Sequence, residues 1–185
     1  MQVDAQRYLE LAEKAGTLAS FDIEAIGLRG DYNSVLVVSI KPYGQKVRTF
    51  KVTKPGKDKE LVAAASAELA KYDVWVGYYS KGFDIPMLNT RLLRWSLPPI
   101  PKRHHVDMYY TLKYNLLTAR RSQGHLLAWL ELPEEKMTVS ASVWSEIIAE
   151  PDRHMPTMVK RCESDAVGLE ALYKRTRHLI LEVKR

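Results

Sequence analysis

The spacing of apolar residues predicts five strands, three of them consecutive near the start of the chain. Apolar and polar residues alternate, or apolar residues run together, in short segments bounded by turn residues, as is typical of strands. The expected strands span residues 17–25, 34–40, 46–52, 73–78 and 104–106. Short turns between the first three predict an antiparallel meander. The buried segment 73–78 is expected to run parallel to the first strand.

Helical periodicity occupies most of the remaining chain. The expected helices span residues 3–15, 58–71, 84–95, 107–117, 123–132, 143–148 and 151–181, and 133–136 is expected to be a loop. Asp58 and Asp107 stand where aspartate is a favoured N-cap. Three strands followed by alternating helices and strands predict an α/β fold with a mixed five-stranded sheet. We expect one domain over residues 1–185, with a helix in 1–16 and the core in 17–180.

The amino-acid composition limits the expected binding partners and cellular location. The chain has 185 residues, of which 46% are hydrophobic, and a net charge of +6 that favours a polyanionic partner. Cys162 is the single cysteine, which excludes an intramolecular disulfide and a cysteine-rich zinc site. Because no apolar run approaches the ~20 residues of a membrane span, we expect no membrane association. The first residues lack the pattern of a secretion signal, so a cytoplasmic protein is expected.

Two acidic residues lie in the first predicted strand. Side chains alternate across a strand, so Asp22 and Glu24 project to one face while Phe21, Ile23 and Ala25 face a core. Two neighbouring carboxylates repel each other unless a cation lies between them, and Mg²⁺ and Mn²⁺ prefer such oxygen ligands. An isolated D-x-E of this kind is more often an ordinary surface pair.

Two further aspartates have simpler explanations when each is taken alone. Asp84 follows a predicted strand and begins a helix, so it is expected to face the crevice at the end of the sheet or to cap the helix. Asp165 lies inside the last long helix, where aspartate has poor propensity unless it is exposed or has a function.

Taken together, these segments resemble a known family. Residues 21–28, F-D-I-E-A-I-G-L, resemble the first motif of the DEDD superfamily of 3′→5′ exonucleases, usually F-D-I-E-T-x-G-L. Residues 77–92 resemble the second motif of the proofreading domains of family B DNA polymerases and their stand-alone relatives. Residues 161–165, R-C-E-S-D, are similar to the third motif, Y-C-x-x-D, and 124–130 resemble the helix before it. The resemblance covers roughly residues 17–180 and implies an RNase H-like fold.

The resemblance also implies a site and a reaction. In the family, four carboxylates hold two divalent ions about 4 Å apart; one ion activates a water and the other stabilises the leaving 3′ oxygen. By motif, the metal ligands here are Asp22, Glu24, Asp84 and Asp165, with two Mg²⁺ or Mn²⁺ ions as cofactors. Glu24 is also expected to contact the terminal 3′-hydroxyl. The implied activity is hydrolysis of phosphodiester bonds at the 3′ end of single-stranded nucleic acid, with DNA favoured over RNA.

One position departs from the family pattern. The tyrosine that precedes the last aspartate by four residues is Arg161 here, and the histidine of the other branch, five residues before, is Lys160. Arginine stays protonated and cannot act as a general base. Arg161 is therefore either a catalytic residue that neutralises a phosphate or developing charge, or a solvated helix residue. Tyr78, Tyr79 or a histidine is an alternative source of the missing group.

Other side chains are candidates for nucleic-acid contacts. Tyr79 is expected to stack on a base, although core packing is the alternative for one of Tyr78 and Tyr79. Phe83 is expected to contact nucleic acid through the second motif. The basic residues expected to contact phosphates are Lys81, Arg103, Arg120 and Arg121. The alternative for each basic residue is a solvated surface position. Packing is favoured for Tyr109, Tyr110 and Tyr114. His104, His105 and Asp107 form a possible metal set that we disfavour, because oxygen-only ligands suit Mg²⁺ and Mn²⁺ better.

Three functions remain open from the sequence. The leading hypothesis is the metal-dependent exonuclease. The second is a catalytically weak nucleic-acid-binding module of the same fold, in which Arg161 replaces the water-positioning group. The third is a structure-specific endonuclease. Protein partners are not predicted.

Overall fold

A mixed five-stranded sheet forms the centre of the molecule in the computed structural model, which describes residues 4–134 and 137–183. The strands lie in the order β3-β2-β1-β4-β5. They are β1 (Leu18–Ala25), β2 (Val35–Pro42), β3 (Arg48–Lys51), β4 (Val74–Gly77) and β5 (His104–Asp107). β1 pairs antiparallel with β2 and parallel with β4, while β2–β3 is antiparallel and β4–β5 is parallel. The predicted α/β class, the meander and the parallel strands are confirmed.

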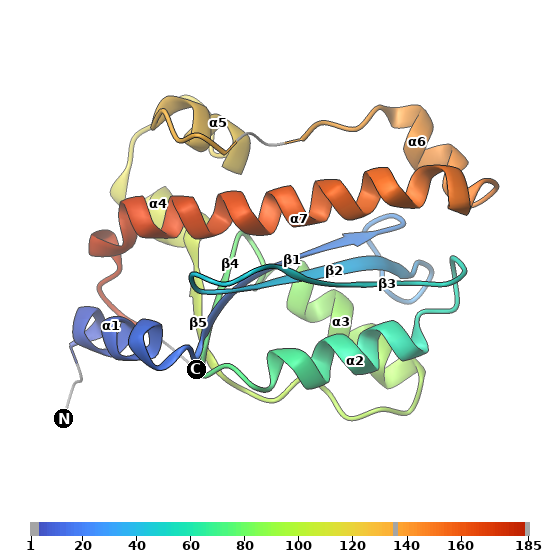
Figure 1. Cartoon of the computed structure of the whole chain (residues 1–185), viewed down its shortest axis with the longest axis horizontal. Helices are drawn as coiled ribbons and strands as arrows, with labels where there is room; N and C mark the ends of the chain where they lie inside the picture. The colour runs from blue at the N-terminus through green and yellow to red at the C-terminus, as the bar shows by residue number, and fades with distance from the viewer. Residues whose placement is uncertain (1–3, 135–136, 184–185) are drawn as a thin grey trace.

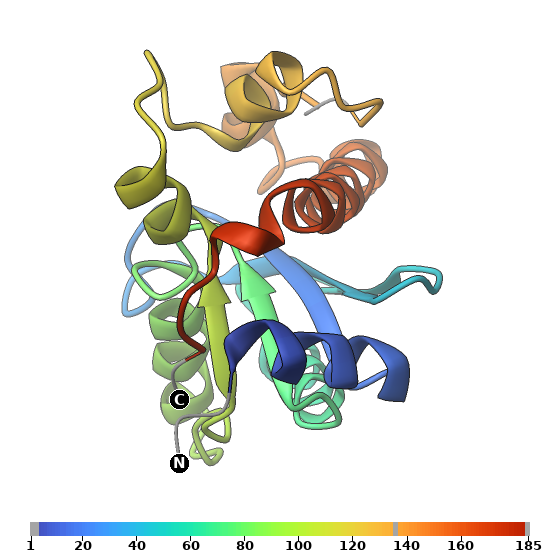
Figure 2. The ribbon, with the colours of Figure 1, turned by 90° about the vertical axis from the view of Figure 1, so that its left-hand side faces the viewer.

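Helices cover both faces of this sheet. They are α1 (Ala5–Ala15), α2 (Lys59–Leu69), α3 (Asp84–Arg94), α4 (Met108–Asn115), α5 (Gln123–Trp129), α6 (Ala141–Glu146), α7 (Pro151–Thr176) and the 3-10 helix η1 (Arg177–Leu179). The long helix α7 lies across one face, α2 and α3 lie on the other, and α5 and α6 lie beyond α7 (Figures 1 and 2). No described helix has the length and apolar character needed to cross a membrane.

The predicted boundaries differ from the observed ones mainly at helix ends. The helix expected over 151–181 ends at Thr176 and continues as η1. The weak helix expected over 143–148 is α6, two residues earlier. The expected start of the first helix at residue 3, and residues 135–136 of the expected loop, lie outside the described residues.

β1 separates two sets of side chains, as its alternation predicts. On one face, Glu24 lies under α7, and the thiol of Cys162 in α7 donates to the backbone carbonyl of Asp22 at 3.3 Å. On the other face, Phe21 packs edge-on against Trp75 of β4, with ring centroids 6.3 Å apart, and the Trp75 indole donates to the carbonyl at the end of α2. The acidic face of β1 is therefore the face that α7 covers.

The two predicted aspartate caps had different outcomes. Asp107 caps α4, because its carboxylate accepts from the backbone N–H of Tyr109 at 3.1 Å. Asp58 occupies the N-cap position of α2 as predicted, but its carboxylate makes no capping hydrogen bond. It accepts instead from Arg91 Nε at 2.8 Å and from the Trp95 indole at 2.8 Å, because α3 brings these donors into the interior.

Candidate active site

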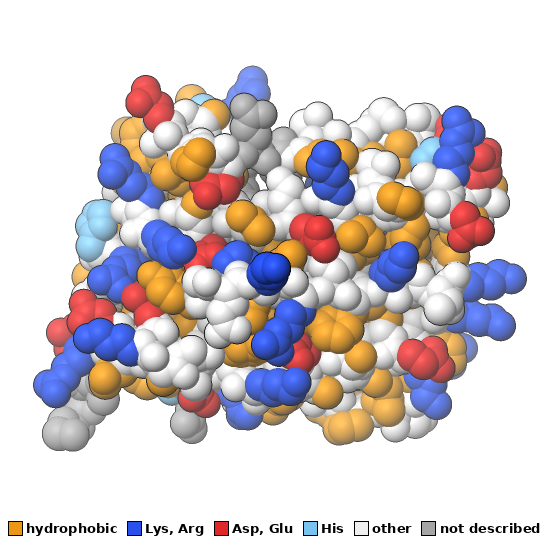
Figure 3. All heavy atoms as spheres, in the orientation of Figure 1, with side chains coloured by type: hydrophobic (Ala, Val, Ile, Leu, Met, Phe, Trp, Pro, Cys, Tyr) orange, Lys and Arg blue, Asp and Glu red, His pale blue; other side chains and the backbone are white. Residues whose placement is uncertain are grey.

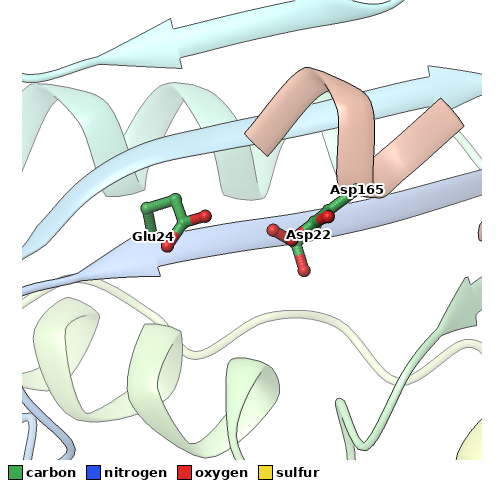
Figure 4. Close-up of side chains that lie close together, drawn as sticks. All are labelled: Asp22, Glu24 and Asp165. Atoms are coloured by element: carbon green, nitrogen blue, oxygen red, sulfur yellow. The ribbon is translucent and has the colours of Figure 1, made fainter. Parts of the chain in front are cut away.

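Three carboxylates from distant parts of the chain lie together on the α7 face of the sheet. Asp22 and Glu24 come from β1 and Asp165 from α7 (Figure 4). One oxygen of each can be chosen so that all three lie within 4.8 Å of one another, and within the described residues these form the group of acidic, His or Cys side chains suited to an ion. Glu24 and Asp165 are buried and Asp22 is half-buried. Hard oxygen donors at this separation fit a divalent ion such as Mg²⁺ or Mn²⁺.

Backbone contacts hold the two elements that carry these carboxylates. In β1, Asp22 lies opposite Ser39 and Glu24 opposite Val37, in register with β2 at the centre of the sheet. In α7, the backbone carbonyl of Asp165 accepts from the buried amide of Gln123 in α5 at 2.8 Å. Because both elements are packed on more than one side, the carboxylates are held in place without relying on exposed loops.

Arg161 lies directly against the carboxylates. Its Nε donates to Glu24 Oε1 at 2.5 Å, and its Nη2 lies 3.9 Å from Asp165 Oδ2. Its Nη1 donates to the carbonyl of Met137 at 3.2 Å, and its guanidinium lies 5.7 Å from the ring centre of Trp144. The alternative of a solvated helix residue was wrong, since the Arg161 side chain is 19% exposed and ion-paired.

The charge of Arg161 is stabilised by this setting. Desolvation opposes the charged form, but Coulombic attraction and the hydrogen bond to Glu24, followed by attraction to Asp165 and Asp22, outweigh it and raise the pKa of Arg161 above its ordinary value. The guanidinium is therefore a permanent positive group inside the carboxylate cluster.

Asp84, the expected fourth ligand, does not join the group of three. It is the first residue of α3, and the N-cap position belongs to Phe83, so the capping interpretation was also wrong. The Asp84 carboxyl is buried, and burial raises its pKa well above the ordinary range. Backbone hydrogen bonds from Asp84 itself and Ile23 oppose the shift, whereas the charges of Asp107 and Glu24 add to it. The sequence motif identified Asp84 as a site residue, but it could not show that Asp84 lies apart from the other three carboxylates.

The sequence predicts Asp107 as a cap and disfavours it as a metal ligand; in the structure it also organises the loop that leads to Asp84. Its two carboxylate oxygens accept from the backbone N–H groups of Tyr79 and Lys81, each at 2.9 Å. Asp107 lies beside Gly77 in the β4–β5 register, so it stands where the loop leaves the sheet. An acidic residue directly after a predicted parallel strand was the signal that would have identified it.

One of the two histidines before Asp107 contacts the same loop. His105 is buried, and its Nε2 lies 2.8 Å from the hydroxyl of Ser80. Burial, with a smaller contribution from Lys81, lowers the pKa of His105 to about 3. A Cβ at Gly77 would lie 1.8 Å from the Ser80 hydroxyl, so this close packing requires glycine. His105 thus supports the loop through Ser80.

The side chain of Tyr79, in the same loop, packs against a small aromatic cluster. Its backbone has φ of +58°, an uncommon conformation for a residue with a side chain. Its ring packs edge-on against Tyr109 with centroids 5.1 Å apart, and lies 5.9 Å from Tyr110. A Cβ at Gly82 would come within 2.6 Å of the Tyr79 ring, so glycine makes room for it. The ring remains 45% exposed and can be reached by a ligand.

Other tyrosines divide between packing and exposure. Tyr78 is half-buried, and its hydroxyl donates to the carbonyl of Arg121 at 2.5 Å, so packing applies to Tyr78 rather than Tyr79. Tyr109 and Tyr110 are half-buried as expected, but packing was the wrong expectation for Tyr114, which is 76% exposed. The Arg121 side chain is exposed, beside the carbonyl that Tyr78 holds.

Two surface cavities are lined by residues expected to contact nucleic acid, and one of them adjoins the carboxylates. One, of about 410 Å³, is lined by Glu24, Phe83 and Trp144 together with apolar residues at the end of β1. The other, of about 320 Å³, is lined by residues that include Lys81 and Tyr110. The residues expected to contact nucleic acid are thus distributed over separate places, with Phe83 beside the carboxylates and Lys81 beside the tyrosines.

The positive charge does not form one continuous patch on the face seen in Figure 3. Lysine and arginine side chains are spread over this face and alternate with acidic ones. The net charge of +6 therefore does not by itself mark a nucleic-acid-binding surface on that side.

Comparison with known proteins gives a family and a fold. The model of the RNase_H superfamily matches residues 19–177. The family B DNA polymerase from the hyperthermophilic archaeon Pyrobaculum calidifontis is similar in structure, with a TM-score of 0.64 and 18% sequence identity. The similarity covers 86% of this chain and 24% of the polymerase, so the chain corresponds to about a quarter of that protein. No curated protein matches the chain.

Proposed function

This chain belongs to the RNase H superfamily, and from that premise we propose that it is a divalent-metal-dependent 3′→5′ exonuclease acting on single-stranded nucleic acid. The observation that carries the proposal is the convergence of Asp22, Glu24 and Asp165 from β1 and α7. The 3′→5′ direction and the preference for DNA rest on the resemblance of residues 21–28 and 77–92 to DEDD exonuclease motifs.

The residues have distinct roles in this proposal. Asp22, Glu24 and Asp165 bind the divalent metal, and Asp84 supports them from its buried position as the fourth carboxyl. A bound divalent ion supplies Lewis-acid stabilisation of the phosphodiester and of the leaving oxygen. The cavity beside Glu24, with Phe83 on its wall, receives the terminal nucleotide.

The single strand leaves this cavity toward the tyrosine cluster. Base–aromatic stacking does not depend on sequence, so the exposed Tyr79 ring suits any base. Lys81 and Arg121 are the exposed basic residues of the adjoining segments and would contact phosphates. These contacts would position the strand and leave the chemistry to the carboxylates.

The direct test uses a 5′-labelled single strand with Mg²⁺, with Mn²⁺ and with chelator. A metal-dependent ladder that shortens from the 3′ end is the expected result, and D22N should abolish it. D31N, which changes an exposed aspartate in the loop after β1, is the matched control and should cut like the parent. Cleavage of a circular single strand would identify an endonuclease and overturn the exonuclease proposal.

A second candidate function is a nucleic-acid-binding module with weak catalysis. The contact of Arg161 with Glu24 favours it, because the residue that would position water is replaced by one that pairs with a candidate metal ligand. The substitution R161Y tests it. A large gain in the rate of cleavage would support the weakly catalytic binding module, whereas an unchanged rate would count against it.

A further inference from the structure

The guanidinium of Arg161 is fixed from several sides at once. Glu24 and Asp165 lie on its carboxylate side, the Met137 carbonyl accepts from it, and the Trp144 ring lies 5.7 Å away. The segment around α6 therefore holds the cation against the cluster, so that the guanidinium is not free to swing away as an exposed arginine is.

This placement changes the charge that the site offers to ions. Asp22, Glu24, Asp165 and Asp84 carry at most four negative charges, and Arg161 already supplies one positive charge among them. The guanidinium lowers the negative potential that these carboxylates offer to cations. A second divalent ion beside Arg161 would be repelled by this fixed positive charge, so it should bind more weakly than a first ion placed away from it.

The contact also uses a ligand atom. Glu24 Oε1 accepts a short, charge-assisted hydrogen bond from Arg161 Nε. An ion that needed this oxygen would have to displace the guanidinium. Asp22 and Asp165 lie next to each other in Figure 4, with Glu24 further along β1, so an ion bound mainly by the two aspartates leaves the Arg161–Glu24 pair intact.

We infer that Arg161 sets the metal stoichiometry of this site, so that it binds one divalent cation, with the guanidinium as its second positive group. The inference rests on the proposed metal-dependent function and departs from the two-ion arrangement expected from the sequence. It makes Arg161 a residue that determines the number of metal ions bound.

Calorimetric titration with Mn²⁺ alone, without nucleic acid, tests the inference. The unmodified protein should bind one ion per chain, and R161Q should bind two. R161K, which keeps the charge, should remain at one. R153Q is the matched control, since Arg153 also lies on α7 but is exposed and pairs with Glu150 at 3.0 Å. If R161Q does not fold, R161M keeps the apolar stem beside Trp144 and should bind two ions.

The outcomes separate this inference from the proposed function. Two ions bound by the unmodified protein, or one ion bound by the folded R161Q and R161M variants, would overturn the inference. Two ions together with 3′→5′ cleavage would leave the proposed function standing. One ion together with no cleavage would support the inference and remove the exonuclease, and no bound ion would overturn both.

Discussion

Two arginine–carboxylate pairs in this molecule are chemically alike and have opposite surroundings. Arg91 donates to both oxygens of Asp58, from Nε at 2.8 Å and from Nη2 at 2.9 Å, and both side chains are almost fully buried. The Trp95 indole and the Val35 N–H complete the hydrogen bonding of the same carboxylate. One positive and one negative charge thus form a closed unit that joins α3 to the start of α2.

The Arg161–Glu24 pair is not closed in this way. Arg161 contacts Glu24 at 2.5 Å and lies near Asp165, and Asp22 belongs to the same group. This one guanidinium lies among three clustered carboxylates, whose mutual repulsion a divalent ion would relieve. The comparison teaches that the balance of charges, rather than the presence of an ion pair, separates a structural pair from a site able to bind a ligand.

The largest expected effect comes from removing one of the three clustered carboxylates. D22N should lower the cleavage rate by roughly a thousandfold or more, because the divalent ion loses a ligand worth several kcal/mol to the transition state. Its stability in chelator should equal or exceed that of the parent, since a like-charge repulsion is relieved. Single-turnover cleavage and urea denaturation measure the two effects. A strongly destabilised D22N would contradict the view that repulsion between neighbouring carboxylates dominates at Asp22.

Breaking the Arg91–Asp58 pair should lower stability and leave cleavage by the folded protein unchanged. D58A leaves the Arg91 guanidinium buried without its counter-charge and should lower the free energy of unfolding by about 3–5 kcal/mol. Urea denaturation is the measurement, and cleavage by the fraction that remains folded should be preserved. D73A, at an exposed position before β4, serves as the control and should unfold like the parent. A D58A variant as stable as the parent would show that the pair is dispensable.

Added Mg²⁺ should stabilise the protein through the carboxylate site and not through the Arg91–Asp58 pair. At a free Mg²⁺ concentration about 100 times the dissociation constant, ion binding should raise the free energy of unfolding by about 2.7 kcal/mol. Thermal denaturation with Mg²⁺ and with chelator measures this gain, which should be absent in D22N and present in D58A. Equal gains in both variants would place the ion elsewhere.

The smallest expected effect separates the two arginines by geometry. Arg91 uses Nε and both terminal nitrogens, with Nη1 donating to the Gly30 carbonyl, so one lysine nitrogen cannot replace it. R91K should cost about 1–3 kcal/mol of stability, the value of a charged hydrogen bond or two. R161K should cost less than R91K, because Arg161 is partly exposed and one lysine nitrogen can keep the pair with Glu24, while only the hydrogen bond to the Met137 carbonyl is lost. Chemical denaturation of both variants tests the order, and the reverse order would contradict the comparison.

Much of the fold was predictable because its signals are local. Alternation along residues 17–25 identified β1 and placed Asp22 and Glu24 on one face, and short turns predicted the β1–β2–β3 meander. The aspartate before α4 capped it as its chemistry suggests. Helix ends were less certain, as at α7, where the apolar pattern continues beyond Thr176 into η1.

The candidate site was predictable only in part. Motif spacing identified Asp22, Glu24 and Asp165, which the structure brings within 4.8 Å. It also identified Asp84, which lies outside that group, buried at the start of α3. What separates them is the packing of α3 relative to β1 and α7, and periodicity along a chain does not record distances between separate elements.

The order of the elements, the acidic face of β1 and the arginine at position 161 follow from local sequence. Packing between distant elements is what brings Arg161 against Glu24, 137 residues away, and directs the Asp58 carboxylate to Arg91 rather than to the first turn of α2. Local patterns specify which face of an element a side chain occupies. The partner of a charge depends instead on which elements pack together, because hydrogen bonds require their atoms to lie within about 3 Å of each other.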